Sequence, residues 1–514
     1  MNKTAKMTRL ASVLFAVILS LSMFSFTAIA APRIADGDKG SITVTNVDST
    51  ATATAYQIMT VNFNYDANQP ADPEYIWADG AVAYISAHYP QYINTADHSV
   101  TDAYAELAKS DNSAQARTFF ADLAAAIKDG SITATGKSAG VGPQTIGNLD
   151  MGSYLVLIEG GVKIYQPIAV NVVPTYNSAT DSWSIDNQTI TNTKSTLPTI
   201  DKQVDESQKN FSIGDDVHYT VTATVPTYPQ NATAKAFEVS DTLSESLTYN
   251  KDAKVYGVGA DNQQTLLTEG VDYTVATARL DGQTADFVIK FNYDKISQYT
   301  KVAVKYSAKL NEKTVIGDAG NKNAAKLIYN NNPYDNSTWK DGDSTVDVYS
   351  LGFDITKIDN TTQAALTGAE FTLSATEGGE AIHFVQTSAG HYTKAVDGQT
   401  GTTTLAVDNN GKLILSGLKA GTYYLTETKA PAGGYKVPSK PFTLTVKDDD
   451  NDGIADGFTT GYAEVKVENS KGFSLPSTGG AGTVMFAVGG VALIALGGAM
   501  IVVLRKKSKT AENN

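Results

Sequence analysis

The sequence predicts a mainly β protein built from three tandem β-sandwich domains, the first of which carries a helical insertion. The chain has 514 residues, which is too long for one hydrophobic core. Short runs of alternating apolar and polar residues, rich in β-branched side chains, recur along most of it, whereas helical periodicity is confined to one stretch. The chain has no cysteine and a net charge of −14. Thiol nucleophiles and thiolate metal sites are therefore excluded, and nucleic acid is disfavoured as a partner.

The first 30 residues have the layout of a secretory signal peptide. A basic start precedes an apolar run from Leu10 to Phe26, and Ala28-Ile29-Ala30 supplies a small-residue cleavage site. A retained membrane helix is the alternative, but serines interrupt the apolar run. We therefore predict that residues 1–30 are removed and that the mature chain begins at Ala31.

The first domain is predicted to span residues 31–196. Apolar residues recur at helical spacing from Tyr104 to Ile127, and Gly130 follows as a helix C-cap. This helical part lies between segments with strand-like alternation, at 41–47, 51–59, 153–158, 165–173 and 182–193. The pattern predicts a β-sandwich interrupted by helices.

The second and third domains are predicted to span residues 197–350 and 351–472. Pro198 breaks the preceding strand, and the strands that follow have the length and turn spacing of an immunoglobulin-like sandwich. The expected strands of the second domain are 216–225, 236–240, 253–258, 284–291, 301–310 and 324–329, before a turn-rich linker. Those of the third domain are 352–357, 370–375, 412–415, 421–428, 442–446 and 462–468.

Residues 473–514 combine a short motif, an apolar span and a basic tail. The run from Ala481 to Leu504 has no charge and is long enough to cross a bilayer as a helix. Basic residues at 505–509 would hold the end of the chain in the cytoplasm. The motif that precedes the span is Leu475, Pro476, Ser477, Thr478 and Gly479. The three parts in this order resemble a sortase sorting signal, which implies cleavage between Thr478 and Gly479. An ordinary membrane anchor with a chance pentapeptide is the weaker interpretation.

In the third domain a lysine, a carboxyl group and an asparagine occupy positions that could bring them together. Lys357 lies in the first predicted strand, Glu427 in the segment from Tyr424 to Pro431, and Asn469 at the end of the last strand. Burial would lower the pKa of the lysine and raise that of the acid, which leaves a neutral nucleophilic amine beside a protonated carboxyl. Such a set can form an amide between lysine and asparagine with loss of ammonia. Solvated strand ends and a surface acid are the alternative interpretation.

The residues of this set, with the segment Leu425 to Pro431, resemble the CnaB-type isopeptide domains of sortase-assembled shaft pilins. The resemblance implies that the second domain is CnaA-type. The cross-linking residues that it implies there are Lys202, Asp241 and Asn323, while Asn321 and Asn330 remain alternatives to Asn323.

Shaft pilins also need an exposed lysine that receives the threonine of the next subunit. In the family it lies in a Tyr-Pro-Lys motif at the end of the first domain, and Lys194 falls at the matching place, although the Tyr-Pro pair is missing. Lys163 and Lys202 are alternatives. We expect no internal bond in the first domain, where Lys39 with Asn192 is the one remaining pair to consider.

An acidic loop near the end of the third domain resembles part of a calcium site. Asp448, Asp450, Asp452 and Asp456 alternate around Gly453. The EF-hand pattern is incomplete, because the twelfth position holds Thr459 instead of glutamate. A solvated hairpin tip is the alternative to calcium, and no other cofactor is expected.

The resemblance implies a structural protein and not an enzyme: the shaft subunit of a covalent pilus, exported and then anchored to the cell wall. Its implied partners are pilus-specific and housekeeping sortases, other copies of itself, accessory pilins and peptidoglycan. The alternative is a wall-anchored monomeric adhesin or accessory pilin that binds a host ligand, which would need no linking lysine.

Overall fold

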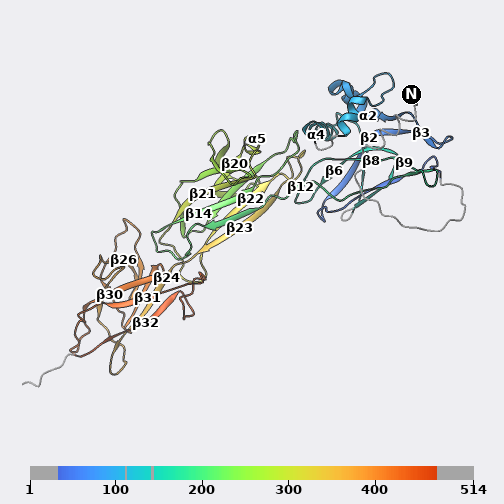
Figure 1. The fold of residues 1–514 in the computed structure, drawn as a ribbon. Coiled ribbons are helices and arrows are strands. Elements are labelled where there is room, and N and C mark those ends of the chain that lie inside the picture. The colour runs from blue at the N-terminus through green and yellow to red at the C-terminus, as the bar shows by residue number, and fades with distance from the viewer. Residues whose placement is uncertain (1–32, 110–112, 140–143, 472–514) are drawn as a thin grey trace, which may run out of the picture. The chain divides into compact units, whose positions relative to one another are not determined.

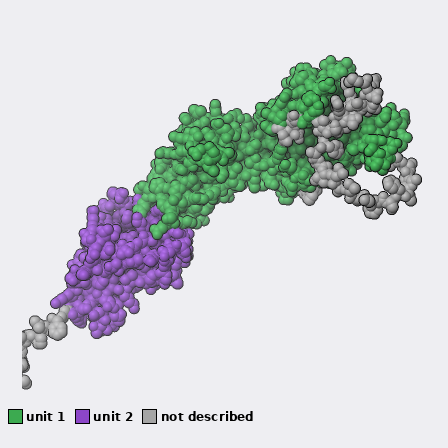
Figure 2. Space-filling model, in the orientation of Figure 1, with its two compact units in different colours: residues 1–209, 215–314, 321–348 green, residues 210–214, 315–320, 349–514 purple. Residues whose placement is uncertain are grey.

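The computed structural model describes residues 33–109, 113–139 and 144–471 (Figure 1). They form two compact units (Figure 2): unit 1 comprises residues 33–209, 215–314 and 321–348, and unit 2 comprises residues 210–214, 315–320 and 349–471. The predicted signal peptide and the predicted C-terminal sorting signal lie outside the described residues. Within the described ranges, every helix is too short or too polar to cross a membrane.

The first domain combines strands with a group of helices. Its elements are β1 (Gly40–Val44), β2 (Thr52–Asn64), β3 (Gln69–Trp77), α2 (Asp79–His88), η1 (Pro90–Tyr92), α3 (Asp102–Ala108), α4 (Ala114–Lys128), β4 (Gly136–Ser138), β5 (Gln144–Leu149), β6 (Gly152–Glu159), β7 (Ile164–Tyr165), β8 (Ile168–Val172), β9 (Pro174–Asn177), β10 (Ser182–Ile185), β11 (Gln188–Ile190) and β12 (Ser195–Thr196). One sheet has the order β3-β2-β6-β8, with β4 beside β2, and another has the order β11-β1-β5.

Strand β6 is buried on both faces, which explains how the helices attach. Val156 and Ile158 pack in the core that the two sheets share, whereas Leu155 and Leu157 face the helices. The predicted helical stretch is present as two helices, α3 and α4, and Gly130 has a φ of +84° just beyond α4. Helix α2 was not predicted, and the expected strand at 182–193 is in fact divided into β10 and β11.

The middle domain is a sandwich of two sheets. Its elements are β13 (Ile200–Val204), β14 (Asp216–Thr224), β15 (Phe237–Leu243), β16 (Leu247–Tyr249), β17 (Lys254–Val258), β18 (Gln264–Leu266), β19 (Tyr273–Ala278), β20 (Thr284–Phe291), α5 (Tyr293–Ile296), β21 (Lys301–Leu310), β22 (Asn321–Tyr329) and β23 (Lys340–Val348). One sheet has the order β13-β14-β21-β17-β18, with β16 on β21, and the other β19-β20-β15-β22-β23. The expectation of an irregular linker up to residue 350 was wrong for β23, because this strand completes the second sheet by pairing with β22.

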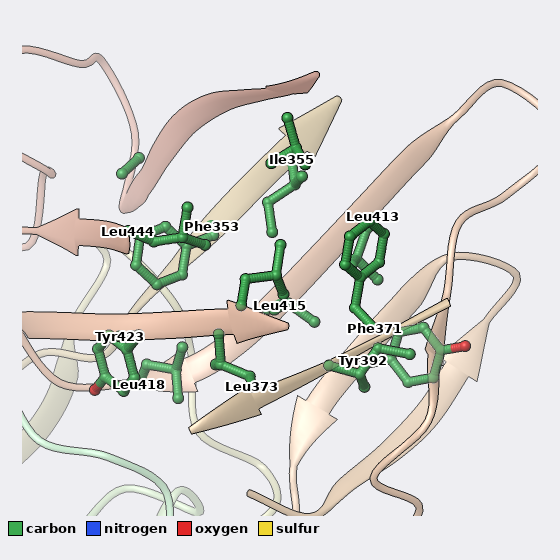
Figure 3. Close-up of a cluster of buried hydrophobic side chains, with 14 of the residues drawn as sticks. Phe353, Ile355, Phe371, Leu373, Tyr392, Leu413, Leu415, Leu418, Tyr423 and Leu444 are labelled. Atoms are coloured by element: carbon green, nitrogen blue, oxygen red, sulfur yellow. The ribbon is translucent and has the colours of Figure 1, made fainter. Parts of the chain in front are cut away.

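The C-terminal domain, in unit 2, is a second sandwich. Its elements are β24 (Leu351–Asp359), β25 (Glu370–Ser374), β26 (Phe384–Ser388), β27 (His391–Lys394), β28 (Leu405–Ala406), β29 (Lys412–Leu418), β30 (Gly421–Lys429), β31 (Phe442–Val446) and β32 (Tyr462–Asn469). The sheets have the orders β26-β27-β29-β24-β32 and β28-β25-β30-β31. Figure 3 shows the core between them, where Phe353 and Leu415 from the first sheet meet Phe371 and Leu444 from the second. The prediction of a mainly β fold of tandem sandwiches is confirmed.

Candidate functional site

The C-terminal sandwich brings Lys357, Glu427 and Asn469 together in its interior. Strands β24 and β32 pair in parallel, with Lys357 opposite Val467, so Asn469 lies two residues further along on the same face. Glu427 comes from β30 in the facing sheet. The side chains of Lys357 and Glu427 are both 0% exposed.

The three side chains are in direct contact. Lys357 Nζ donates to Asn469 Oδ1 at 2.6 Å and lies 3.5 Å from Glu427 Oε2. Asn469 Nδ2 donates to Glu427 Oε1 at 2.7 Å. The carboxyl group therefore touches both the amine and the amide nitrogen of the side chain that the amine would attack.

Burial sets the ionisation of this group. It lowers the pKa of the Lys357 amine and raises the pKa of Glu427, while the attraction between the two charges acts in the opposite direction on each. One proton can therefore pass from the Lys357 ammonium to the Glu427 carboxylate without a change in net charge. The products of that transfer are a neutral nucleophile and a general acid.

The middle domain assembles its set across the sandwich. Lys202 lies on β13 in one sheet, and Asp241 and Asn323 lie on the adjacent strands β15 and β22 of the other. Asp241 is opposite Ala325, so Asn323 is diagonal to it on the same face. The side chains of Lys202 and Asp241 are 0% exposed, and Asn323 is also buried.

The contacts at this site include a residue that the sequence analysis missed. Lys202 Nζ donates to Asp241 Oδ2 and to the hydroxyl oxygen of Tyr306. Asn323 Nδ2 donates to the same hydroxyl oxygen at 2.9 Å. Lys202 Nζ also lies 4.9 Å from the ring centres of Tyr219 and Tyr306, which stack on each other. Alternation along 301–310 places Tyr306 on the inward face of its strand, but no local pattern indicates which strands it faces.

Burial also sets the ionisation of the middle site. It lowers the pKa of Lys202 and raises the pKa of Asp241 to about 6, while the charge of Lys202 partly offsets the second shift. The pair can hold one proton between them, as the C-terminal pair can.

The two alternative asparagines have other partners. Asn321 is buried and its Nδ2 donates to Val348 O at 3.0 Å. Asn330 Oδ1 accepts from Ala236 N at 2.6 Å, and its Nδ2 donates to Thr338 O. Both side chains therefore hold backbone groups of neighbouring segments, whereas Asn323 is the asparagine that meets the lysine site.

The lysines of the first domain have different surroundings from these two sites. Lys39 pairs with Asp150, while Asn192 is exposed, so this alternative pair is not brought together. Lys163 Nζ lies 3.3 Å from Asp48. Lys194 is exposed just before β12, where its carbonyl accepts from Gln166 N at 2.9 Å. Lys194 also lines a hollow of about 640 Å³ in unit 1.

In the acidic loop of the C-terminal domain, three of the four predicted aspartates lie close together. Carboxylate oxygens of Asp448, Asp450 and Asp456 all lie within 4.8 Å of one another. Asp452 Oδ1 instead accepts from Ile454 N at 2.7 Å. The structure thus offers three of the four predicted oxygen ligands in one place.

Three family models match parts of the chain. Residues 213–333 match a Gram-positive pilin backbone subunit 2, Cna-B-like domain, and residues 352–457 match a prealbumin-like fold domain. Residues 467–510 match an LPXTG cell wall anchor motif. The middle domain is thus described as Cna-B-like, whereas the resemblance in the sequence indicated the CnaA type.

Individual relatives agree with these matches. The trypsin-resistant surface T6 protein of Streptococcus pyogenes serotype M6 is 28% identical over 382 residues, which cover 61% of this chain and 70% of the relative. The fimbrial subunit type 1 of Actinomyces viscosus is 26% identical over 367 residues, covering 62% and 66%. Among solved structures, the T6 backbone pilin of serotype M6 S. pyogenes has the same fold, with a TM-score of 0.55 and 20% identity over 86% of this chain and 95% of the other.

The fold and the wall anchor define a structural protein of the bacterial cell surface, not an enzyme. More specifically, the chain belongs to the sortase-assembled backbone pilins of Gram-positive bacteria. It is a subunit of an extracellular pilus that its LPXTG motif anchors to the cell wall.

Proposed function

We propose that this chain is the shaft subunit of the pilus, and that two internal isopeptide bonds and one intermolecular bond let it withstand tension. The observation that carries the proposal is the pair of buried lysine, acid and asparagine sets, one in each of the last two domains. In each, the lysine amine attacks the side-chain carbonyl carbon of the asparagine and ammonia leaves. The products are a bond from Lys202 to Asn323 and a bond from Lys357 to Asn469.

The acid makes this reaction possible at neutral pH. Asp241 or Glu427 takes the proton of the ammonium, which leaves the amine nucleophilic, and can then protonate the reacting amide. The strands hold the groups of each set close together, in direct contact for Lys357 and Asn469 and through the Tyr306 hydroxyl for Lys202 and Asn323, so the reaction is intramolecular. The product is a neutral amide, which removes the cost of burying charged groups in the core.

The intermolecular bond is proposed to join Thr478 of one subunit to Lys194 of the next. Lys194 is exposed, as an acceptor must be, whereas Lys202 is buried and is engaged in its own site. Linking one surface to a different surface of the next copy produces an open filament. Tension along it would then be carried by covalent bonds instead of hydrogen bonds, which are worth about 1 kcal/mol each.

The internal bonds are tested by the intact mass of residues 31–471. We expect the wild-type region to be lighter than its sequence by two molecules of ammonia. Asn323→Ala and Asn469→Ala should each lack one of these losses, while the matched variant Asn321→Ala should keep both. An unmodified wild-type mass would refute the two bonds.

The intermolecular bond is tested on cell-wall extracts. Lys194→Ala should abolish the high-mass ladders that pilus polymers give on blots, while the subunit still reaches the wall. Lys163→Ala, a matched change in the same domain, should leave the ladders intact. Ladders that persist in Lys194→Ala would show that another lysine forms the bond.

Calcium binding by the acidic loop stays a prediction, because gathered carboxylates are common without a cation. Titration of calcium into residues 31–471, followed by calorimetry, should show binding that Asp450→Asn removes. Equal heats for the wild type and the variant would leave the loop as a solvated hairpin tip.

A further inference from the structure

We propose that the Tyr306 hydroxyl is a catalytic group in the middle domain, which relays a proton from Lys202 Nζ to the leaving nitrogen of Asn323. The inference rests on the proposed bond between these two residues. The hydroxyl oxygen is hydrogen-bonded to both nitrogen atoms, at 2.9 Å for Asn323 Nδ2. It therefore stands between the atom that must lose a proton and the atom that must gain one.

The two sites differ in which group contacts the amide nitrogen. In the C-terminal domain Glu427 contacts both Lys357 and Asn469 Nδ2. In the middle domain the acid is an aspartate, which is one methylene shorter, and its hydrogen bond goes to the lysine. The Tyr306 hydroxyl makes the contact to Asn323 Nδ2. In the middle domain Asp241 and Tyr306 together make the two contacts, to the lysine and to the amide nitrogen, that Glu427 alone makes in the C-terminal domain.

The strand register explains why Tyr306 is in position. It lies on β21 directly opposite Tyr219 on β14, and Lys202 is opposite Val221, two residues further along β14. All three side chains therefore share the inner face of one sheet, facing β15 and β22. Tyr306 is 3% exposed, and its ring stacks on Tyr219 with centres 5.4 Å apart. The hydroxyl is held rigidly where the two sheets meet.

The relay balances the atoms of the reaction. The bond from Nζ to the side-chain carbonyl carbon of Asn323 forms, and the bond from that carbon to Nδ2 breaks. The neutral amine brings two protons, of which one stays on the new amide and the other must reach Nδ2 to give ammonia. Tyr306 accepts this proton from Nζ and donates its own to Nδ2, so the phenol is regenerated.

The environment favours a concerted exchange over a phenolate intermediate. Burial raises the pKa of Tyr306, and the nearby charge of Asp241 raises it further. The phenol therefore remains protonated, and it can take up a proton only as it gives one away. Asp241 keeps its separate task of accepting the ammonium proton from Lys202.

The test is the rate at which unlinked chain forms its bonds. Residues 31–471 can be isolated from inclusion bodies in denaturant and refolded by dilution. The reaction is then quenched at intervals, and the intact mass of each sample is measured. Peptide mapping then assigns each loss of ammonia to the middle or the C-terminal bond. Tyr306→Phe, which keeps the ring, should slow the middle bond by ~10-fold or more, since general acid–base groups contribute ~10²–10⁴-fold.

Two further variants and an internal reference isolate the relay. The C-terminal bond should form at the wild-type rate in every variant, which serves as an internal reference for refolding of the separate C-terminal unit. Tyr228→Phe removes a different buried hydroxyl of the middle domain, which donates to Asn330 O outside the Lys202 site, and should leave the rate of the middle bond within a few-fold. Adding Asp241→Glu to Tyr306→Phe should restore part of the rate, because the longer acid can contact the amide nitrogen as Glu427 does.

Each outcome has a defined meaning. An unchanged rate in Tyr306→Phe, or an equal slowing in Tyr228→Phe, would overturn the relay and leave Asp241 as the sole proton carrier. A wild-type chain that never forms the middle bond would instead refute the proposed function at that site. The two failures are distinguished by the wild-type mass alone.

Discussion

Replacing Lys357 with methionine should strongly destabilise the C-terminal domain, because the proposed cross-link to Asn469 can no longer form. Methionine keeps most of the apolar stem of the lysine. Glu427 can remain buried as a neutral acid, because burial already raises its pKa and Asn469 Nδ2 contacts it. Lys357→Met therefore measures the contribution of the bond to stability more directly than a substitution of Asn469, which would leave Lys357 buried without its bond partner.

The expected size follows from the loop that the bond closes. Lys357 and Asn469 are 112 residues apart, and the chain-entropy relation gives about 5 kcal/mol at 25 °C for a loop of this length. Spread over a domain of roughly 120 residues, whose entropy of unfolding is about 0.25 kcal/mol/K, this corresponds to a fall of roughly 20 °C in the unfolding temperature.

The assay is differential scanning calorimetry of residues 31–471, with intact masses to count the bonds. The matched control is Lys429→Met in the same domain. Its side chain is 62% exposed in a salt bridge to Glu370, so it should cost less than about 1 kcal/mol. A fall of only a few degrees in Lys357→Met, in a protein whose wild type carries the bond, would refute the reasoning.

Two other predictions concern the middle and first domains. The proposed Lys202–Asn323 bond should form more slowly as the pH falls through about 6. Below that pH the Asp241 carboxylate is already protonated by solvent, so it can no longer accept the proton of the Lys202 ammonium. Refolding at a series of pH values from 5 to 8 with mass detection checks this, and a rate that does not change with pH would contradict it. Leu155→Ala should destabilise the first domain by ~2–5 kcal/mol in urea unfolding, because Leu155 is fully buried beneath the helices. Val162→Ala, at an exposed position of the same domain, is its control, and equal losses would contradict the assignment of β6 as a core strand.

Much of the fold was predictable because its signals are local. Alternation and β-branching identified β14, β21 and β24, and helical spacing identified α3 and α4. Strand β23 was missed because its sequence, from Lys340 to Val348, is largely polar and half exposed. This strand forms because its backbone pairs with β22, and its side chains carry no alternating pattern that would predict that pairing.

The sequence by itself identified the sorting motif, which matches an LPXTG cell wall anchor, and it predicted the export signal and the residue types of both proposed cross-linking sets, because each depends on composition and order over a short stretch. Only the tertiary structure decided which groups meet. Asn323, and not Asn321 or Asn330, contacts the lysine site, and Tyr306, 104 residues from Lys202, completes it. A period of two tells which face a side chain occupies, but the register and the packing of two sheets decide what lies across from it.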